Sequence, residues 1–133
     1  MAGAGYSGKP LADKLGIKPG AKVWTSAPPP HYEPLLAPWP AGAVMTADAA
    51  EADVLHAFVN DREDLTRQTE FLTNVARTGA ALWISWPKKA SAKFVDLTED
   101  GVREVLLPTG WVDVKVCAVD ADWSGLKFLR RRR

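Results

Sequence analysis

Two short apolar runs joined by one amphipathic segment constrain the fold of this chain more than any other feature. Residues 54–59 and 80–86 are almost continuously apolar, as expected of strands that are covered on both faces. Between them lie five apolar side chains at the spacing of one helical face: Leu65, Phe71, Leu72, Val75 and Ala76. A strand, a helix and a second strand in this order favour a right-handed crossover, so we expect the two strands to lie parallel in one sheet.

Local signals predict the ends of this helix and the elements around it. Asp61 follows the first strand as an N-cap, and Gly79 is expected to end the helix. A second helix should begin at Asp96 or Thr98 and stop at Pro108. Shorter patterns predict a small helix within residues 1–20, strands at 21–26 and 43–46, a helical turn at 31–36, and an antiparallel hairpin formed by residues 111–119 and 125–130.

These elements predict an α/β fold: one three-layer, open and mostly parallel sheet, with an antiparallel hairpin at its C-terminal edge. The 133 residues amount to a single domain, which is large enough to fold around its own core without a disulfide or a metal. Within it, residues 1–9 are expected to be a flexible N-terminus and residues 130–133 a solvated basic tail.

Charge and composition argue against several classes of protein. The 17 basic and 16 acidic residues leave a net charge of +1, which argues against a nucleic-acid partner. One cysteine, Cys117, and two histidines, His31 and His56, provide no complete metal site, so we expect no metal. No apolar run approaches the ~18 residues needed to cross a bilayer, and the first residues lack the apolar core of a signal peptide. A cytoplasmic protein without a membrane contact is therefore expected.

Five stretches distributed over most of the chain form distinctive motifs. They read GYSGKPL (5–11), KLGIKPG (14–20), LWISWPKK (82–89), DVKVCAVD (113–120) and WSGLK (123–127). Together they resemble a bacterial family that is known only as a domain of unknown function. This resemblance implies no particular activity.

The order of the elements is also similar to that of class I S-adenosylmethionine-dependent methyltransferases, reduced to their later part. Ile17–Trp24 resembles the approach to the first motif of these enzymes, and Gly79–Ile84 resembles their fifth strand. The last two predicted strands resemble their antiparallel edge. The resemblance implies a Rossmann-like, methyltransferase-like fold.

The same comparison reveals a departure at the cofactor site. Where those enzymes have a glycine-rich turn after the first strand, this chain has Thr25–Pro30, which ends in three consecutive prolines. Proline removes backbone N–H donors and adds bulk where a cofactor needs a close approach. In those enzymes an acidic residue at the end of the second strand holds the ribose of the cofactor. In this chain only Asp48 lies near the corresponding position. We therefore expect no cofactor, and no S-adenosylmethionine bound in the way these enzymes bind it.

The candidate ligand site lies at the carboxyl ends of the predicted strands, where open α/β sheets bind their ligands. The predicted ligand-binding residues are Ser26, Asp61, Ser85, Trp86, Lys88 and Lys89. The two lysines favour an anionic small molecule, and Trp86 could supply a flat apolar wall. In the alternative interpretation, Asp61 only caps a helix and both lysines are solvated.

No catalytic set is legible, because neither Ser26 nor Ser85 sits in a nucleophile elbow and no triad can be recognised. The leading hypothesis is a vestigial, non-catalytic methyltransferase-like domain that binds a small molecule or a protein. Two alternatives stay open: a small enzyme that acts on an anionic metabolite at the strand ends, and a homodimeric interaction protein.

Overall fold

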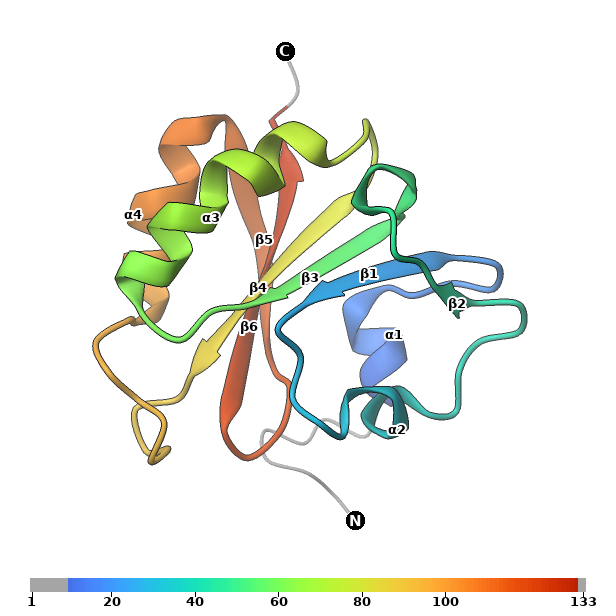
Figure 1. Ribbon diagram of the computed structural model, residues 1–133, viewed down its shortest axis with the longest axis horizontal. Coiled ribbons are helices and arrows are strands. Elements are labelled where there is room, and N and C mark those ends of the chain that lie inside the picture. The colour runs from blue at the N-terminus through green and yellow to red at the C-terminus, as the bar shows by residue number, and fades with distance from the viewer. Residues whose placement is uncertain (1–9, 132–133) are drawn as a thin grey trace.

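The computed structural model describes residues 10–131, which form one six-stranded sheet with helices on both faces (Figure 1). The strands lie in the order β2-β1-β3-β4-β6-β5. The first four run parallel, and β6 runs antiparallel to both β4 and β5. The predicted α/β fold with an antiparallel C-terminal hairpin is confirmed. The strands are β1 (Lys22–Ser26), β2 (Val44–Met45), β3 (Val54–Phe58), β4 (Ala81–Pro87), β5 (Trp111–Ala118) and β6 (Trp123–Arg130).

Helices cover both faces of the sheet, which gives the three layers that the sequence predicts. Helices α3 and α4 pack on one face, and α1 and α2 pack on the other. The expectations for residues 1–9 and for the last two arginines lie outside the described residues. The helices are α1 (Leu11–Leu15), α2 (Tyr32–Leu36), α3 (Arg62–Val75) and α4 (Glu99–Leu106), with 3-10 turns η1 (Ala49–Glu51) and η2 (Leu107–Thr109).

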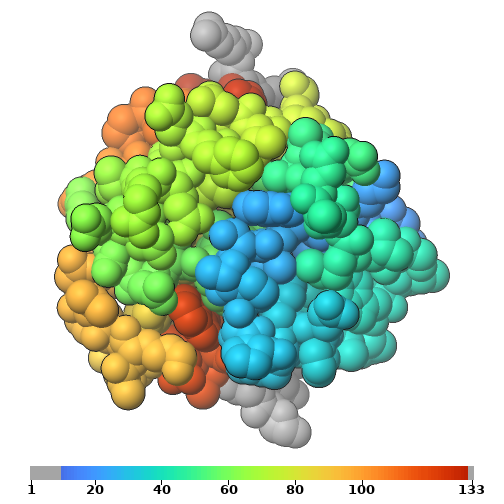
Figure 2. Space-filling model, viewed as in Figure 1, coloured from blue at the N-terminus to red at the C-terminus, as the bar shows by residue number. Residues whose placement is uncertain are grey.

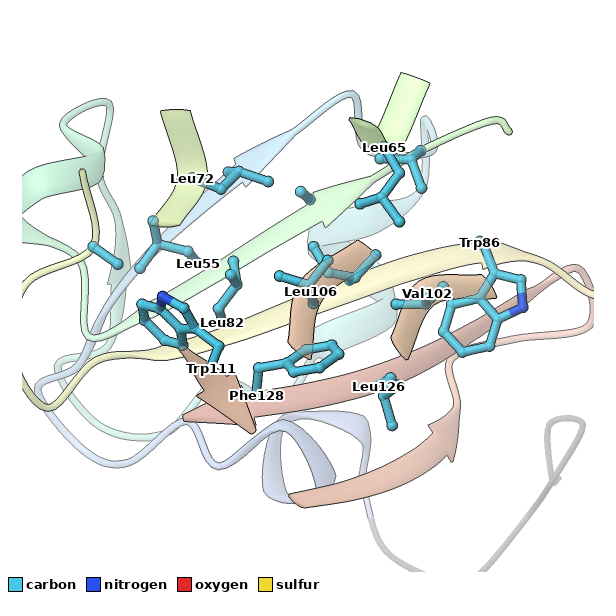
Figure 3. Packing of buried hydrophobic residues seen from close by; sticks show 14 of the residues in the cluster. Leu55, Leu65, Leu72, Leu82, Trp86, Val102, Leu106, Trp111, Leu126 and Phe128 are labelled. Atoms are coloured by element: carbon cyan, nitrogen blue, oxygen red, sulfur yellow. The ribbon is translucent and has the colours of Figure 1, made fainter. Parts of the chain in front are cut away.

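Side chains of the two central strands alternate between the two faces, and both faces are buried. β3 pairs with β4 in parallel, with Leu55 opposite Leu82. These two leucines lie in the cluster under α3 and α4, where Leu65 and Leu72 of α3 pack over the sheet (Figure 3). Neighbouring positions such as Trp83 belong to the second cluster, under α1 and α2. Burial on both faces explains why these strands read as continuous apolar runs.

Side-chain caps begin both long helices. The carboxylate of Asp61 accepts a hydrogen bond from the backbone N–H of Asp64 at 2.8 Å, which confirms the predicted N-cap of α3. Thr98 is the residue that caps α4. The other candidate, Asp96, instead accepts a hydrogen bond from the first backbone N–H of α3, at 3.0 Å. Asp96 therefore ties the loop before α4 to the start of α3.

Gly79 does not end α3, and this prediction was wrong. The helix stops at Val75, and Ala76 follows it in an extended conformation. Gly79 lies in the next turn, where the backbone N–H of Ala80 donates to the carbonyl of Arg77 at 3.1 Å. Its φ of +89° demands glycine. The residue therefore marks the tight entry into β4 rather than the end of the helix.

The hairpin inserts its second strand into the sheet and leaves β5 at the edge. β6 lies between β4 and β5, with Phe128 opposite Leu82. Arg130 ends β6, and its guanidinium lies 4.9 Å from the centre of the Trp111 ring. The same group donates to the carbonyl of Ala76 at 2.9 Å. This arginine therefore fastens the C-terminal end of α3 to the hairpin.

Candidate functional site at the carboxyl edge of the sheet

Parallel strands β1, β3 and β4 end at one edge of the sheet, and predicted site residues follow these ends (Figure 1). Ser26 is the last residue of β1, Asp61 caps α3 just after β3, and Lys88 and Lys89 follow β4 directly. The turn between β5 and β6 reaches the same edge, because the backbone N–H of Lys88 donates to the carbonyl of Asp122 at 2.8 Å. The structure therefore brings these four predicted residues to one edge.

The loop after β1 is held in place by other parts of the chain. Ala27 has a φ of +52°, a left-handed conformation that glycine ordinarily supplies. Pro29 is buried, and His31 Nε2 lies 3.0 Å from Asp120 Oδ2 in the turn between β5 and β6. Because that turn lies beyond β3 and β4 in the sheet, the loop is fastened across the ends of the central strands.

Polar groups between β1 and α3 bond to one another. Ser26 Oγ donates to Gln68 Oε1 at 3.4 Å, and Gln68 Nε2 donates to Asp64 Oδ1 at 2.8 Å. The second oxygen of Asp64 accepts from the backbone N–H of Asn60 at 3.0 Å. In the space-filling view, the blue segment around the end of β1 lies directly against the green α3 (Figure 2). The polar side chains at the start of α3 therefore have hydrogen-bond partners within the protein. No local pattern in the sequence pointed to Gln68.

Ser85 and Trp86 are buried and face opposite sides of the sheet. The Ser85 hydroxyl is fully buried on the side of α1 and α2 and lies 2.6 Å from His56 Nε2. Trp86 is 4% exposed and packs in the cluster beneath α3 and α4 (Figure 3). Because both side chains are buried, neither Ser85 nor Trp86 forms an exposed surface together with Lys88 and Lys89. The two buried residues support the end of β4 from within.

A buried polar network that the sequence analysis missed lies beneath the candidate site. The Tyr32 hydroxyl lies 2.9 Å from His56 Nδ1, and Ser85 lies against the other ring nitrogen. The network joins α2, β3 and β4, and Thr25 of β1 adds a hydrogen bond to the carbonyl of His56 at 2.8 Å. The ring of Phe58 stacks on the imidazole at 4.3 Å between centroids. Only the placement of a histidine within an apolar strand signalled this network in the sequence.

Burial sets the charge state of this network. It lowers the pKa of His56 to about 3, so the imidazole is neutral near pH 7. It also raises the pKa of the Tyr32 phenol far above its ordinary value. Because His56 and Ser85 are fully buried and Tyr32 nearly so, no solvent-borne substrate can reach them. The network is neutral, and its hydrogen bonds hold α2 against the sheet.

The two lysines are the positively charged groups of the predicted set. Lys88 is half-buried and Lys89 is exposed. Within residues 10–131, neither lysine forms an ion pair. Unpaired ammonium groups at a strand end can attract an anion, and they can equally be solvated. Binding at this edge therefore stays a prediction.

Asp48, the candidate acid for a ribose, has a local partner. It follows β2 and caps η1, with its Oδ1 accepting from the backbone N–H of Ala50 at 2.9 Å. The backbone N–H of Asp48 in turn bonds to the hydroxyl of Thr46 at 3.1 Å. This carboxylate therefore has a structural role at the turn after β2.

Among residues 10–131, His, Cys, Asp and Glu side chains form no group of three or more that could hold a metal ion. None of the helices described is long and apolar enough to span a bilayer.

The comparisons with known proteins show similarity of fold only. No protein-family model matches the chain, and no curated protein matches it. The resemblance to a family of unknown function therefore has no support from these comparisons. Among solved structures, an S-adenosylmethionine-dependent methyltransferase from Aquifex aeolicus matches with a TM-score of 0.62 and 14% identity, over 89% of this chain and 86% of that one.

Other structural neighbours are of the same kind. The magnesium protoporphyrin IX methyltransferase from Synechocystis PCC 6803, solved with bound S-adenosylmethionine, gives a TM-score of 0.56 at 14% identity, over 90% of this chain and 74% of that one. A tRNA methyltransferase from B. subtilis gives 0.60 at 11% identity, over 92% and 65%. The chain therefore has the Rossmann-like fold of the class I methyltransferases.

Proposed function

We propose that this chain is a methyltransferase-like domain that does not transfer methyl groups and instead binds a small anionic molecule. The turn after β1 carries this proposal. In the related fold, a glycine-rich turn at this point gives a cofactor close access to backbone N–H donors. Here Pro28, Pro29 and Pro30 have no N–H to offer, and Ala27 puts a methyl group at the left-handed position.

The anchoring of this loop supports the same proposal. Pro29 and Tyr32 are buried, and His31 bonds to Asp120 across the strand ends. Tyr32 is further held by His56 in the core. A loop anchored in this way cannot swing aside to admit a cofactor without exposing buried groups, which costs about 1–3 kcal/mol for each hydrogen bond left unmade.

The proposed ligand site is the carboxyl edge that the sequence predicts. Lys88 and Lys89 would supply positive charge to an anion, and Ser26 would border it from the end of β1. Asp61 would hold the start of α3 in place through its cap. Ser85 and Trp86 would act from beneath, by fixing the strand on which the lysines sit.

A thermal-shift panel of phosphorylated and carboxylated metabolites tests this site, because a ligand that binds the folded state raises the melting temperature. For a ligand found in this way, the double variant Lys88→Ala/Lys89→Ala should bind at least about tenfold more weakly, with an unchanged melting temperature in the absence of ligand. The variant Lys93→Ala, which removes an exposed lysine from the following loop, serves as the matched control. Equal affinity of the double variant and the wild-type protein would reject the carboxyl-edge site.

A further inference from the structure

A pocket of about 410 Å³ opens at the opposite edge of the sheet, where the parallel strands begin. Its volume lies within the range of small-molecule sites, roughly 300–1,000 Å³. The walls come from the turn after α1, the starts of β3 and β4, and the outer part of β6. The lining residues that matter here are Gly16, Gly20, Gly79, Lys18, Lys127 and Asp53.

The three glycines give this pocket a rim without side chains. Gly16, Gly20 and Gly79 have φ values of +78°, +80° and +89°, conformations that demand glycine. A Cβ atom on Gly20 would meet no other atom within 4 Å, so the space beside that residue is open. A ligand can therefore approach the backbone of this rim closely.

Two lysines bring positive charge to the pocket, and a third stands beside one of them. A Cβ atom on Gly16 would lie 3.6 Å from Lys127 Nζ, which places that ammonium group at the rim. Lys18 lies between Gly16 and Gly20 on the turn after α1. In the hairpin, Lys115 of β5 lies directly opposite Lys127 of β6. Like charges in such a cross-strand pair repel each other and destabilise a sheet, so an anion bound beside them would relieve this repulsion.

No described acid compensates these charges. Asp53 lines the pocket, but its carboxylate is bonded by Arg77 and by a backbone N–H at the start of β1, the latter at 2.8 Å. Lys18, Lys115 and Lys127 form no ion pair within residues 10–131. Burial, followed by repulsion from Lys115 and Lys18, lowers the pKa of Lys127. This is the behaviour of an ammonium group without a counter-charge.

We propose that this pocket binds a small molecule that carries a phosphate group, with Lys18 and Lys127 as the anion contacts and the glycine rim against the rest of the molecule. Lysine ammonium groups are common phosphate ligands. The small volume of the pocket and the net charge of +1 favour a small molecule over a nucleic acid, which needs an extended basic surface. Because Lys88 and Lys89 lie at the other edge of the sheet, this site is independent of the function proposed above.

An NMR titration with inorganic pyrophosphate at constant ionic strength tests the proposal. The backbone amide signals of Gly16, Gly20 and Gly79 should shift and saturate at millimolar or lower concentration, while the signals of Lys88 and Lys89 stay in place. Saturable shifts at Lys88 and Lys89 alone would overturn this site and favour the carboxyl edge instead. Shifts that rise linearly without saturation would also overturn it, because they indicate unspecific ion attraction.

Three glutamine variants identify the groups responsible. Lys18→Gln removes an exposed charge from a turn and leaves the core untouched, and it should weaken pyrophosphate binding at least about fivefold. The double variant Lys18→Gln/Lys127→Gln should abolish saturation, whereas Lys93→Gln should bind as the wild type does. Unchanged binding by Lys18→Gln and the double variant would refute the assignment. Tighter binding of a single-stranded oligonucleotide than of pyrophosphate at these glycines would refute the small-molecule class.

Discussion

Acidification should destabilise this protein through one buried side chain, His56. Its pKa is about 3 in the folded protein, against an ordinary value of 6.5, because the imidazole is fully buried. The unfolded chain therefore takes up a proton at a pH where the folded protein cannot. The stabilising contribution is complete above pH 6.5 and is lost as the pH falls from 6.5 toward 3.

The size of this effect follows from the shift in pKa. Each pH unit below 6.5 costs about 1.4 kcal/mol until the folded protein itself begins to take up the proton. Between pH 7.5 and pH 5, the free energy of unfolding should thus fall by about 2 kcal/mol. This window lies above the range in which most carboxylates titrate, so the contribution of His56 is separable from theirs.

Urea denaturation followed by tryptophan fluorescence at several pH values measures this change. The control is His31→Asn, which removes the exposed histidine and should keep the fall in stability. His56→Asn should be less stable at pH 7.5 but should lose most of the pH dependence. A wild-type stability that stays constant between pH 7.5 and pH 5, or a fall that persists unchanged in His56→Asn, would refute the reasoning.

Two further substitutions test the surroundings of this histidine. Tyr32→Phe removes the hydroxyl that lies 2.9 Å from His56 Nδ1 and should lower the free energy of unfolding by about 1–3 kcal/mol, measured by urea denaturation; a loss below 0.5 kcal/mol would contradict the hydrogen bond. Gly125→Ala would place a Cβ atom 3.2 Å from Ser85 Oγ and 3.3 Å from the Trp83 ring, and overpacking of this kind costs about 1–3 kcal/mol. A melting temperature equal to that of the wild type would show that these neighbours can give way.

The fold was predictable from sequence because its signals are local. The apolar runs 54–59 and 80–86 identify the central strands, and the carboxylate of Asp61 identifies the start of α3. Gly79 led to a wrong prediction for the end of α3, because a glycine with a positive φ occurs in the turn before a strand as well as at the end of a helix. Local patterns therefore located the elements better than they located their ends.

The candidate site was less predictable because it depends on which face each side chain takes and on contacts between distant residues. Strand alternation places the side chains of Ser85 and Trp86 on opposite faces of the sheet, so neighbours in the sequence are separated in the structure. The pairing of Tyr32 with His56 requires α2 to pack on β3, and no local pattern shows this. The pairing of Lys115 with Lys127 depends on the register of the hairpin.

Calorimetric titration of the protein with S-adenosylmethionine tests whether the turn after β1 excludes the cofactor of the methyltransferases. We expect no saturable heat at ligand concentrations up to about 1 mM. Binding weaker than about 4 kcal/mol, which is a Kd of about 1 mM, would give only a linear trace in this range. The physical reason is the turn Ala27–Pro30, which lacks the N–H donors and the open backbone of the methyltransferase site. Saturable binding in the micromolar range, lost when S-adenosylmethionine is replaced by adenine alone, would show that this turn admits the cofactor.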